Sequence, residues 1–382
     1  MELASIWISS IPIFLRELIY EIIYLIYLRC YLIVTLFINL LRNDITTTLI
    51  RIITPFATPI TLIYIAKTVT EKSDKDKKER EERLKKEEKN KQLEDKRQAI
   101  LTDYLKQMTT LLIDKELAAK AYYHPTAQVA RALTLTTIRE LDSERNKLLI
   151  NFLHEANLIQ AGESGDIRYL PCLLKVANLE NINLENANFK GAYLNRTNFY
   201  KANLCKANLK DAYLEVTILI SANLNSANLT GVSLISADLE SANLIAANFT
   251  RANLENATLK SASLNWAILN EACIQSTDLE GANLTYANLS RANLFGSKLN
   301  EAKIEHAILN NAHLTGAYLL KANLNNSYLK HANLENANLV GALLHGTNFK
   351  DAKVNNAIFG NNEGIDEKMK ADLISRGAIF KD

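Results

Sequence analysis

The chain has 382 residues, a formal net charge of +2 and 48% hydrophobic residues. A charge this close to zero excludes long-range attraction of the whole chain to nucleic acid or to an acidic surface. The four cysteines (Cys30, Cys172, Cys205 and Cys273) have no C-x-x-C spacing and are predicted to be unpaired thiols in a reducing compartment.

Residues 1–66 are predicted to form a hydrophobic membrane anchor of one or two spans. The run 18–41 is interrupted only by Glu21 and Arg29, and a helix of that length spans about 30 Å of hydrocarbon. The run 49–66 is a weaker candidate because it contains one arginine and two prolines. Glu2, and the lack of an A-x-A site after a basic start, argue against a cleaved signal peptide.

Four tyrosines in the first apolar run share one helix face, because their spacings are 4, 3 and 4: Tyr20, Tyr24, Tyr27 and Tyr31. This face has two interpretations, a packing seam against the second run or a surface for self-association.

Residues 67–97 are predicted to be a charged helical linker. Between Glu71 and Arg97 the chain has 12 basic and 10 acidic residues without Gly or Pro, which is typical of a solvated helix or spacer. The first lysines directly follow the second apolar run, so the positive-inside rule predicts a membrane-anchored protein with most of the chain in the cytoplasm.

Residues 98–170 are predicted to be a small module of three amphipathic helices. The first covers Ala99 to Lys120, the second begins at Pro125, and Asp142 can cap the third. This module also holds the only titratable residues that an enzyme could use: His124, Asp142, Glu144 and His154. They are better explained as helix caps and surface residues.

Residues 171–360 contain an apolar centre at every fifth position. The register runs from Leu179 to Phe359 without an insertion and gives 37 repeats, with Ala two places before the centre in 29 of them. Asn usually precedes the centre, and proline is absent from 178 to 359. A helix repeats its buried face every 3.6 residues and a strand every 2, so neither explains this period.

A period of five is explained if four repeats close one square turn and the turns stack as a solenoid. Coils about 4.8 Å apart would then build a rod of roughly 45 Å, with one Leu and one Ala pointing inward on each side. Residues twenty apart would stack, so Asn183, Asn203, Asn223 and Asn243 are predicted to form a side-chain ladder.

The A(N/D)LXX pattern resembles the pentapeptide-repeat family. The resemblance implies a mainly β fold, a right-handed quadrilateral β-helix, preceded here by an α-helical region and an N-terminal membrane segment. The order of apolar anchor, helices and repeats resembles cyanobacterial membrane-tethered members. Residues 361–382 are predicted to be a C-terminal capping helix, with Asp366 as N-cap and Gly377 just past its end.

The sequence predicts no catalytic, cofactor-binding or metal site. The histidines inside the array (His306, His313, His331 and His345) include no pair separated by twenty residues, so they do not stack into a metal cage. The chain also lacks a Gly-rich phosphate loop, an H-E-x-x-H motif and a nucleophile elbow.

The outward residues of the rod are expected to determine function. From 174 to 360 the chain has 15 basic and 14 acidic residues, so the rod lacks the acidity of family members that mimic DNA and inhibit a topoisomerase. Outward aromatic residues are candidates for a partner surface: Tyr193 and Tyr213, which should stack, and Phe295, Tyr318 and Tyr328.

We therefore expect a non-enzymatic, membrane-anchored scaffold that presents a β-helical rod to a protein partner in the cytoplasm and contacts lipid through residues 1–66. The alternative is a regulator that binds a nucleic-acid enzyme or DNA through the rod, although the dispersed charges disfavour nucleic acid. End-to-end homo-oligomers remain open, and the capping helix argues against them at the C-terminal end.

Overall fold

The computed structural model describes residues 29, 32–33, 59–160 and 170–381. The chain divides into two compact units, residues 1–90 and 91–382, which are described separately. The predicted anchor and its tyrosine face lie outside the described residues, apart from Arg29, Leu32, Ile33 and the end of the second apolar run. In the described parts of the chain, no helix combines the length and apolar character needed to cross a bilayer.

The charged run is helical. Helix α4 covers Pro59–Asp114, and its residues up to Asn90 are the part of the first unit that is described continuously. The described side chains in this stretch are exposed, as expected for a sequence with a charge at most positions. The last part of α4, from Lys91 on, belongs to the second unit.

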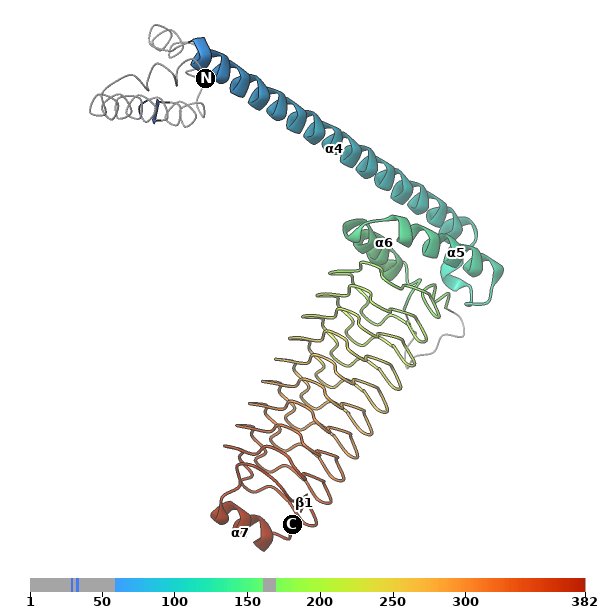
Figure 1. Ribbon diagram of the computed structural model, residues 1–382. Coiled ribbons are helices and arrows are strands. Elements are labelled where there is room, and N and C mark those ends of the chain that lie inside the picture. The colour runs from blue at the N-terminus through green and yellow to red at the C-terminus, as the bar shows by residue number, and fades with distance from the viewer. Residues whose placement is uncertain (1–28, 30–31, 34–58, 161–169, 382) are drawn as a thin grey trace, which may run out of the picture. The chain divides into compact units, whose positions relative to one another are not determined.

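Three helical segments pack together at the start of the second unit (Figure 1). The end of α4 lies with α5 (Pro125–Glu140) and α6 (Ser143–Glu155), and a short 3₁₀ turn, η1 (Leu117–Ala119), follows α4. Their apolar residues Leu101, Met108 and Leu153 are buried in a core that continues into the first coils. Pro125 begins α5 and Asp142 caps α6, which confirms both predictions.

The period-five segment forms a four-sided solenoid (Figure 1). Parallel bridges join residues twenty apart along its length, for example Asn203 to Asn223 and Asn223 to Asn243. Every predicted apolar centre from Leu179 to Phe359 is buried, as are the small residues two places before the centres. A single large and a single small side chain per repeat therefore fill the interior, as the sequence predicted.

Each corner of the solenoid uses a residue with positive φ. These residues follow the apolar centre by two places; Ser221, Ser226 and Gly231 are consecutive examples with φ of 55°, 56° and 67°. The left-handed region is strained for bulky side chains and tolerated by Gly, Asn and small polar residues. A large side chain at a corner is therefore unfavourable for the backbone, and its presence there requires another reason.

The predicted asparagine ladder is confirmed. The amide nitrogen of Asn203 donates to the side-chain oxygen of Asn183 at 3.0 Å, Asn223 donates to Asn203 at 3.0 Å, and Asn243 donates to Asn223 at 3.1 Å. The same oxygens also accept a backbone N–H two residues on, as Asn203 does from Cys205 at 3.2 Å. The ladder therefore satisfies polar groups of the turns, which is a structural role.

The C-terminal end is covered by α7 (Glu367–Ser375) and a short strand. Asp366 caps α7 and Gly377 follows its end with a φ of 90°, which confirms both assignments. Strand β2 (Ile379–Phe380) pairs in parallel with β1 (Ile358–Phe359) of the last coil. Leu373 of α7 is fully buried against the solenoid core.

Candidate functional surfaces

The first coil of the solenoid exposes backbone carbonyls that have no preceding coil to bind. Within the rod these oxygens accept from the coil before, as Asn223 O does from Leu204 N at 2.7 Å. Side chains of α5 and α6 replace the missing coil. Arg139 donates to Asn178 O at 3.1 Å and Asn146 donates to Asn183 O at 3.3 Å.

Two further contacts extend this cap. Arg131 donates to the carbonyls of Lys175 and Val176 at 3.2 and 3.0 Å, and the His154 ring nitrogen Nε2 lies 3.1 Å from Lys190 O. All four side chains of this cap are basic or carry an amide, and each faces a backbone carbonyl of the rod. The helical module is therefore the N-terminal cap of the rod.

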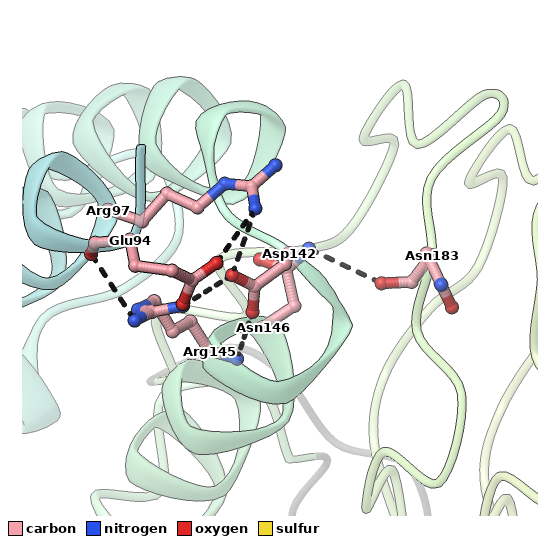
Figure 2. A network of polar contacts seen from close by, with 6 residues as sticks. All are labelled: Glu94, Arg97, Asp142, Arg145, Asn146 and Asn183. Atoms are coloured by element: carbon pink, nitrogen blue, oxygen red, sulfur yellow. Dashed lines mark hydrogen bonds and ion pairs between the residues drawn. The ribbon is translucent and has the colours of Figure 1, made fainter. Parts of the chain in front are cut away.

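A charged network fixes the orientation of this cap (Figure 2). Arg145 of α6 lies 2.9 Å from the carboxylate of Glu94 in α4 and also pairs with Asp142. Arg97 lies 3.4 Å from both Glu94 and Asp142. Because the network joins α4 to the start of α6, it holds Asn146 in position toward the first coil.

The pKa of Asp142 is lowered, so its carboxylate is ionised at neutral pH. Partial burial works toward a higher pKa, but hydrogen bonds from the Arg145 backbone N–H and guanidinium, and the charge of Arg97, outweigh it. The N-cap bond from Arg145 N to Asp142 Oδ1 measures 3.0 Å. The charge of Asp142 therefore contributes to the stability of the cap.

The titratable residues that the sequence offered to an enzyme are held in structural contacts. His124 is the N-cap of α5 and accepts from Thr126 N at 3.2 Å, while Asp142 caps α6. Glu144 lies in the first turn of α6 and His154 near its end. Asp142 and His154 are therefore at opposite ends of the same helix, and we find no geometry that brings the four together.

The histidines and cysteines of the rod are dispersed. Cys172, Cys205 and Cys273 are free thiols, whereas Cys30 lies outside the described residues. Among the residues that the structure describes, no group of three or more His, Cys, Asp or Glu side chains is arranged to hold a metal ion.

The predicted outward aromatic residues do not form one patch, and two of them, Tyr193 and Tyr213, are half-buried. Tyr193 and Tyr213 lie 6.1 Å apart with their rings tilted by 32°, a looser contact than the predicted stack. Phe295, Tyr318 and Tyr328 are exposed.

A second set of aromatic residues forms a tight column that the sequence analysis missed. Trp266 stacks on Tyr286 with ring centroids 4.2 Å apart, and Tyr286 stacks on His306 at 4.8 Å. The rings are within 8° and 7° of parallel. The signal is present in the sequence, because successive members of this set are twenty residues apart.

This aromatic column (Trp266, Tyr286 and His306) occupies strained positions. All three are corner residues, with φ of 62°, 62° and 57°, where other coils place Ser226, Ala246 or Gly346. Trp266 is 59% exposed and Tyr286 43% exposed. The column therefore adds strain and exposes apolar surface without filling the core, which points to a role in recognition.

These observations define the class of the protein: a right-handed, four-sided β-solenoid built from five-residue repeats. A family model described as pentapeptide repeats matches it in eight overlapping copies, which lie at residues 172–211, 197–235, 207–244, 237–275, 247–285, 269–300, 297–330 and 322–361. The chain belongs to the pentapeptide-repeat family.

Several solved structures are similar. HetL, a pentapeptide repeat protein involved in heterocyst differentiation regulation from the cyanobacterium Nostoc sp. strain PCC 7120, is 32% identical over 48% of this chain and 90% of its own, with a TM-score of 0.26. Rfr23 from the cyanobacterium Cyanothece 51142 is 33% identical over 31% of this chain and 64% of its own, with a TM-score of 0.18.

QnrB1, a plasmid-mediated fluoroquinolone resistance protein, is 16% identical over 54% of this chain and 90% of its own, with a TM-score of 0.28. All three TM-scores are low, and these structures assign no function to the chain. No curated protein matches it.

Proposed function

We propose that this protein is a non-enzymatic scaffold that binds a protein partner through the side of its solenoid. In this proposal residues 1–66 tether the chain to a membrane and the rod lies in the cytoplasm. The observation that carries the binding role is the exposed aromatic column, because the fold does not need it.

The interior of the rod supports a binding role over chemistry. Its inward positions are filled by Leu and Ala, with a few Phe, Ile, Val, Thr and Ser residues, and these side chains are almost fully buried. A filled core leaves only the outward columns to vary, and these have a fixed spacing along the rod. Such a surface is suited to flat, repeated contacts with another protein.

The neighbours of the aromatic column support the same role. Ile268 is 40% exposed and Tyr328 50% exposed, and both lie on the bridged column that also contains Ile308. Exposed apolar residues that gather on one side of a soluble module mark interaction sites. Aromatic residues are also the commonest energetic centres of protein interfaces.

The tether rests on the apolar runs of residues 1–66 and the lysines that follow them. Carbonate extraction of the full chain, compared with a version starting at Gln98, tests it. We expect the full chain to stay with the membrane fraction and the shorter version to be released. Release of both would remove the tether from the proposal.

The binding role is tested by a photo-reactive phenylalanine analogue placed at Tyr286 in the full chain, in cells of the source organism. Phe295 is the matched control position, because it lies on a different side of the rod and is also 43% exposed. We expect a discrete protein adduct from position 286 that is absent from position 295 and is lost with Trp266→Ser. Equal adducts from both positions, or none, would contradict the proposal.

A further inference from the structure

We propose that the partner bound by the aromatic column is a second copy of this chain, which presents the opposite side of its rod. The inference rests on the proposed protein-binding function and names its partner. It follows from a comparison of two opposite sides of the solenoid.

The two sides are defined by the repeat. The aromatic side consists of Ala246, Asn248, Thr250, Arg251 and the residues 20, 40, 60 and 80 positions further along. The acidic side consists of Ser236, Asp238, Glu240, Ser241 and the residues at the same increments. Because four repeats of five make one coil, positions ten residues apart lie on opposite sides.

The charges of the two sides are complementary. The aromatic side has three basic residues, Arg251, Arg291 and Lys330, and one acid, Glu271. The acidic side has five acids and three lysines: Asp238, Glu240, Asp278, Glu280 and Glu301 against Lys260, Lys298 and Lys321. One side therefore has a surplus of two positive charges and the other a surplus of two negative charges.

The surplus basic charges of the aromatic side are accessible. Glu271 pairs with Arg251 at 2.8 Å and lies 3.8 Å from Arg291, so a single carboxylate is shared by two guanidinium groups. The side chains of Arg251 and Arg291 are 73% and 72% exposed. On the acidic side the Asp278 side chain is 16% exposed and lies between Lys260 and Lys298 at 3.5 and 3.7 Å, whereas Asp238 is half-buried and has no such pair among the described ion pairs.

The shapes of the facing columns also match when two parallel rods lie side by side. The corner column of the acidic side that faces the aromatic column contains Ser241, Ser261, Gly281 and Glu301. In one register Trp266 lies opposite Ser261, Tyr286 opposite Gly281, and His306 opposite Glu301. The large rings thus meet the smallest residues of that corner, and the histidine meets a carboxylate.

The same register aligns the charges. It places Arg251 beside Asp238 and Arg291 beside Asp278, because the two arginines are forty residues (two coils) apart and so are the two aspartates. A shift by one coil would place Arg291 beside Lys298 and Glu271 beside Asp278. A shift by one coil in the other direction would keep small residues opposite the rings but place Glu271 beside Asp238, so the charges select the register.

Other occupants fit this side less well. The rings of the column are stacked on one another at 4.2 and 4.8 Å, so no base or planar ligand can enter between them. Nucleic acid also requires a denser row of basic residues than the two arginines and one lysine found here. The ring edges and the arginines fit a flat protein surface with small and acidic residues.

The contact joins two different sides of the same rod, so it is heterologous and does not close on itself. Each rod bound through its aromatic side leaves its acidic side free for the next copy. The expected assembly is a row of parallel rods that grows with concentration.

The test is sedimentation velocity of the full-length chain in detergent micelles across a wide concentration range, with two charge variants. Arg251→Glu reverses the aromatic side and Asp238→Lys reverses the acidic side; Lys at that column is already accommodated at Lys298. We expect the wild type to associate with increasing concentration and each variant alone to associate at least tenfold more weakly, because like charges then face each other.

An equimolar mixture of the two variants is the decisive sample. Every contact between alternating variants is again complementary, so the mixture should associate as the wild type does. Lys303→Glu, which makes the same change of charge on another side, should associate as the wild type does. A mixture that remains as weak as its components would overturn the proposal, as would a wild type that does not associate.

The apolar half of the contact is tested with Trp266→Ser and Tyr286→Ser together. Serine occupies the equivalent corner at Ser226, so the double variant should fold and keep its circular dichroism spectrum while association is lost. Unchanged association would overturn the inference.

Failure of this inference is distinguishable from failure of the proposed function. If position 286 forms an adduct with a different protein and the wild type does not self-associate, the scaffold stands and its partner is not a second copy. If position 286 forms no adduct and no association is found, both proposals fail.

Discussion

The two ends of the solenoid expose opposite backbone groups and are closed by different means. In each repeat two N–H groups point to the following coil and one to the preceding coil, as Leu204, Lys206 and Asn203 show. The first coil is therefore left mainly with free carbonyls and the last coil mainly with free N–H groups.

The caps match this polarity. At the first coil, side-chain donors from Arg131, Arg139, Asn146 and His154 meet the carbonyls. At the last coil, backbone carbonyls accept: Asn356 N donates to Gly377 O and Leu344 N donates to Glu363 O, both at 2.8 Å. The comparison teaches that a cap of one end cannot serve the other, since donors and acceptors are exchanged.

The largest effect is expected from a charge buried in the N-terminal cap. Leu153→Asp places a carboxylate at a fully buried position of α6 and should destabilise the cap by about 3 kcal/mol or more. Hydrogen exchange of the first-coil amides should rise while the last coil stays protected.

Leu148→Asp is the matched control, because Leu148 belongs to the same helix and is 56% exposed. It should change the free energy of unfolding by less than about 0.5 kcal/mol. Similar losses in both variants would show that α6 does not close the first coil by packing.

A smaller effect is expected at the other end. Leu373→Ala removes the buried contact of α7 and should cost about 2 to 4 kcal/mol, measured as local exchange of the last-coil amides. Ile374→Ala, at a neighbouring residue that is 50% exposed, should leave this exchange unchanged. Loss of protection at the first coil instead would contradict the separation of the two caps.

Replacing one side-chain nitrogen by oxygen tests whether the first coil requires a hydrogen-bond donor from the cap. Asn146→Asp replaces the amide that donates to Asn183 O with a carboxylate oxygen and should cost about 1 to 3 kcal/mol, since two acceptors then face each other. Asn311→Asp, on an exposed corner, should be close to neutral. Chemical denaturation of both variants, monitored by circular dichroism, makes the comparison.

The smallest effect concerns pH. The folded pKa of Asp142 is lowered, so its contribution to stability is present above its unfolded pKa and is lost as the pH falls through the folded pKa. The acid side of the stability profile should therefore flatten in Asp142→Asn, which keeps a good N-cap residue. An unchanged acid side of the stability profile would mean that the charge of Asp142 does not stabilise the folded protein.

The interior of the rod was predictable from the sequence, and its surface was not. The period of five places Leu204 and Ala202 inside because no other periodic structure buries that spacing. The stack of Trp266 on Tyr286 also follows from the period, but recognising it requires comparing every outward residue at a spacing of twenty. The bond from Asn146 to Asn183 O could not be predicted, since it depends on how α6 packs on the first coil.

The helix boundaries show the same limit. Asp142 and Asp366 carry local capping signals and were identified from sequence. The sequence predicts that the first helix of the module ends at Lys120, whereas α4 ends at Asp114, because the packing of Leu117 in η1 outweighs the helical propensity of the segment.

The central claim is that the rod binds through its sides and that caps cover both of its ends. Crosslinking an equal mixture of unlabelled and ¹⁵N-labelled full-length chains tests this claim most directly. The account predicts mixed-label peptide pairs that join the aromatic side around Arg251 to the acidic side around Asp238. Mixed-label pairs that join only the ends of rods, through α7 or the helical module, would contradict it.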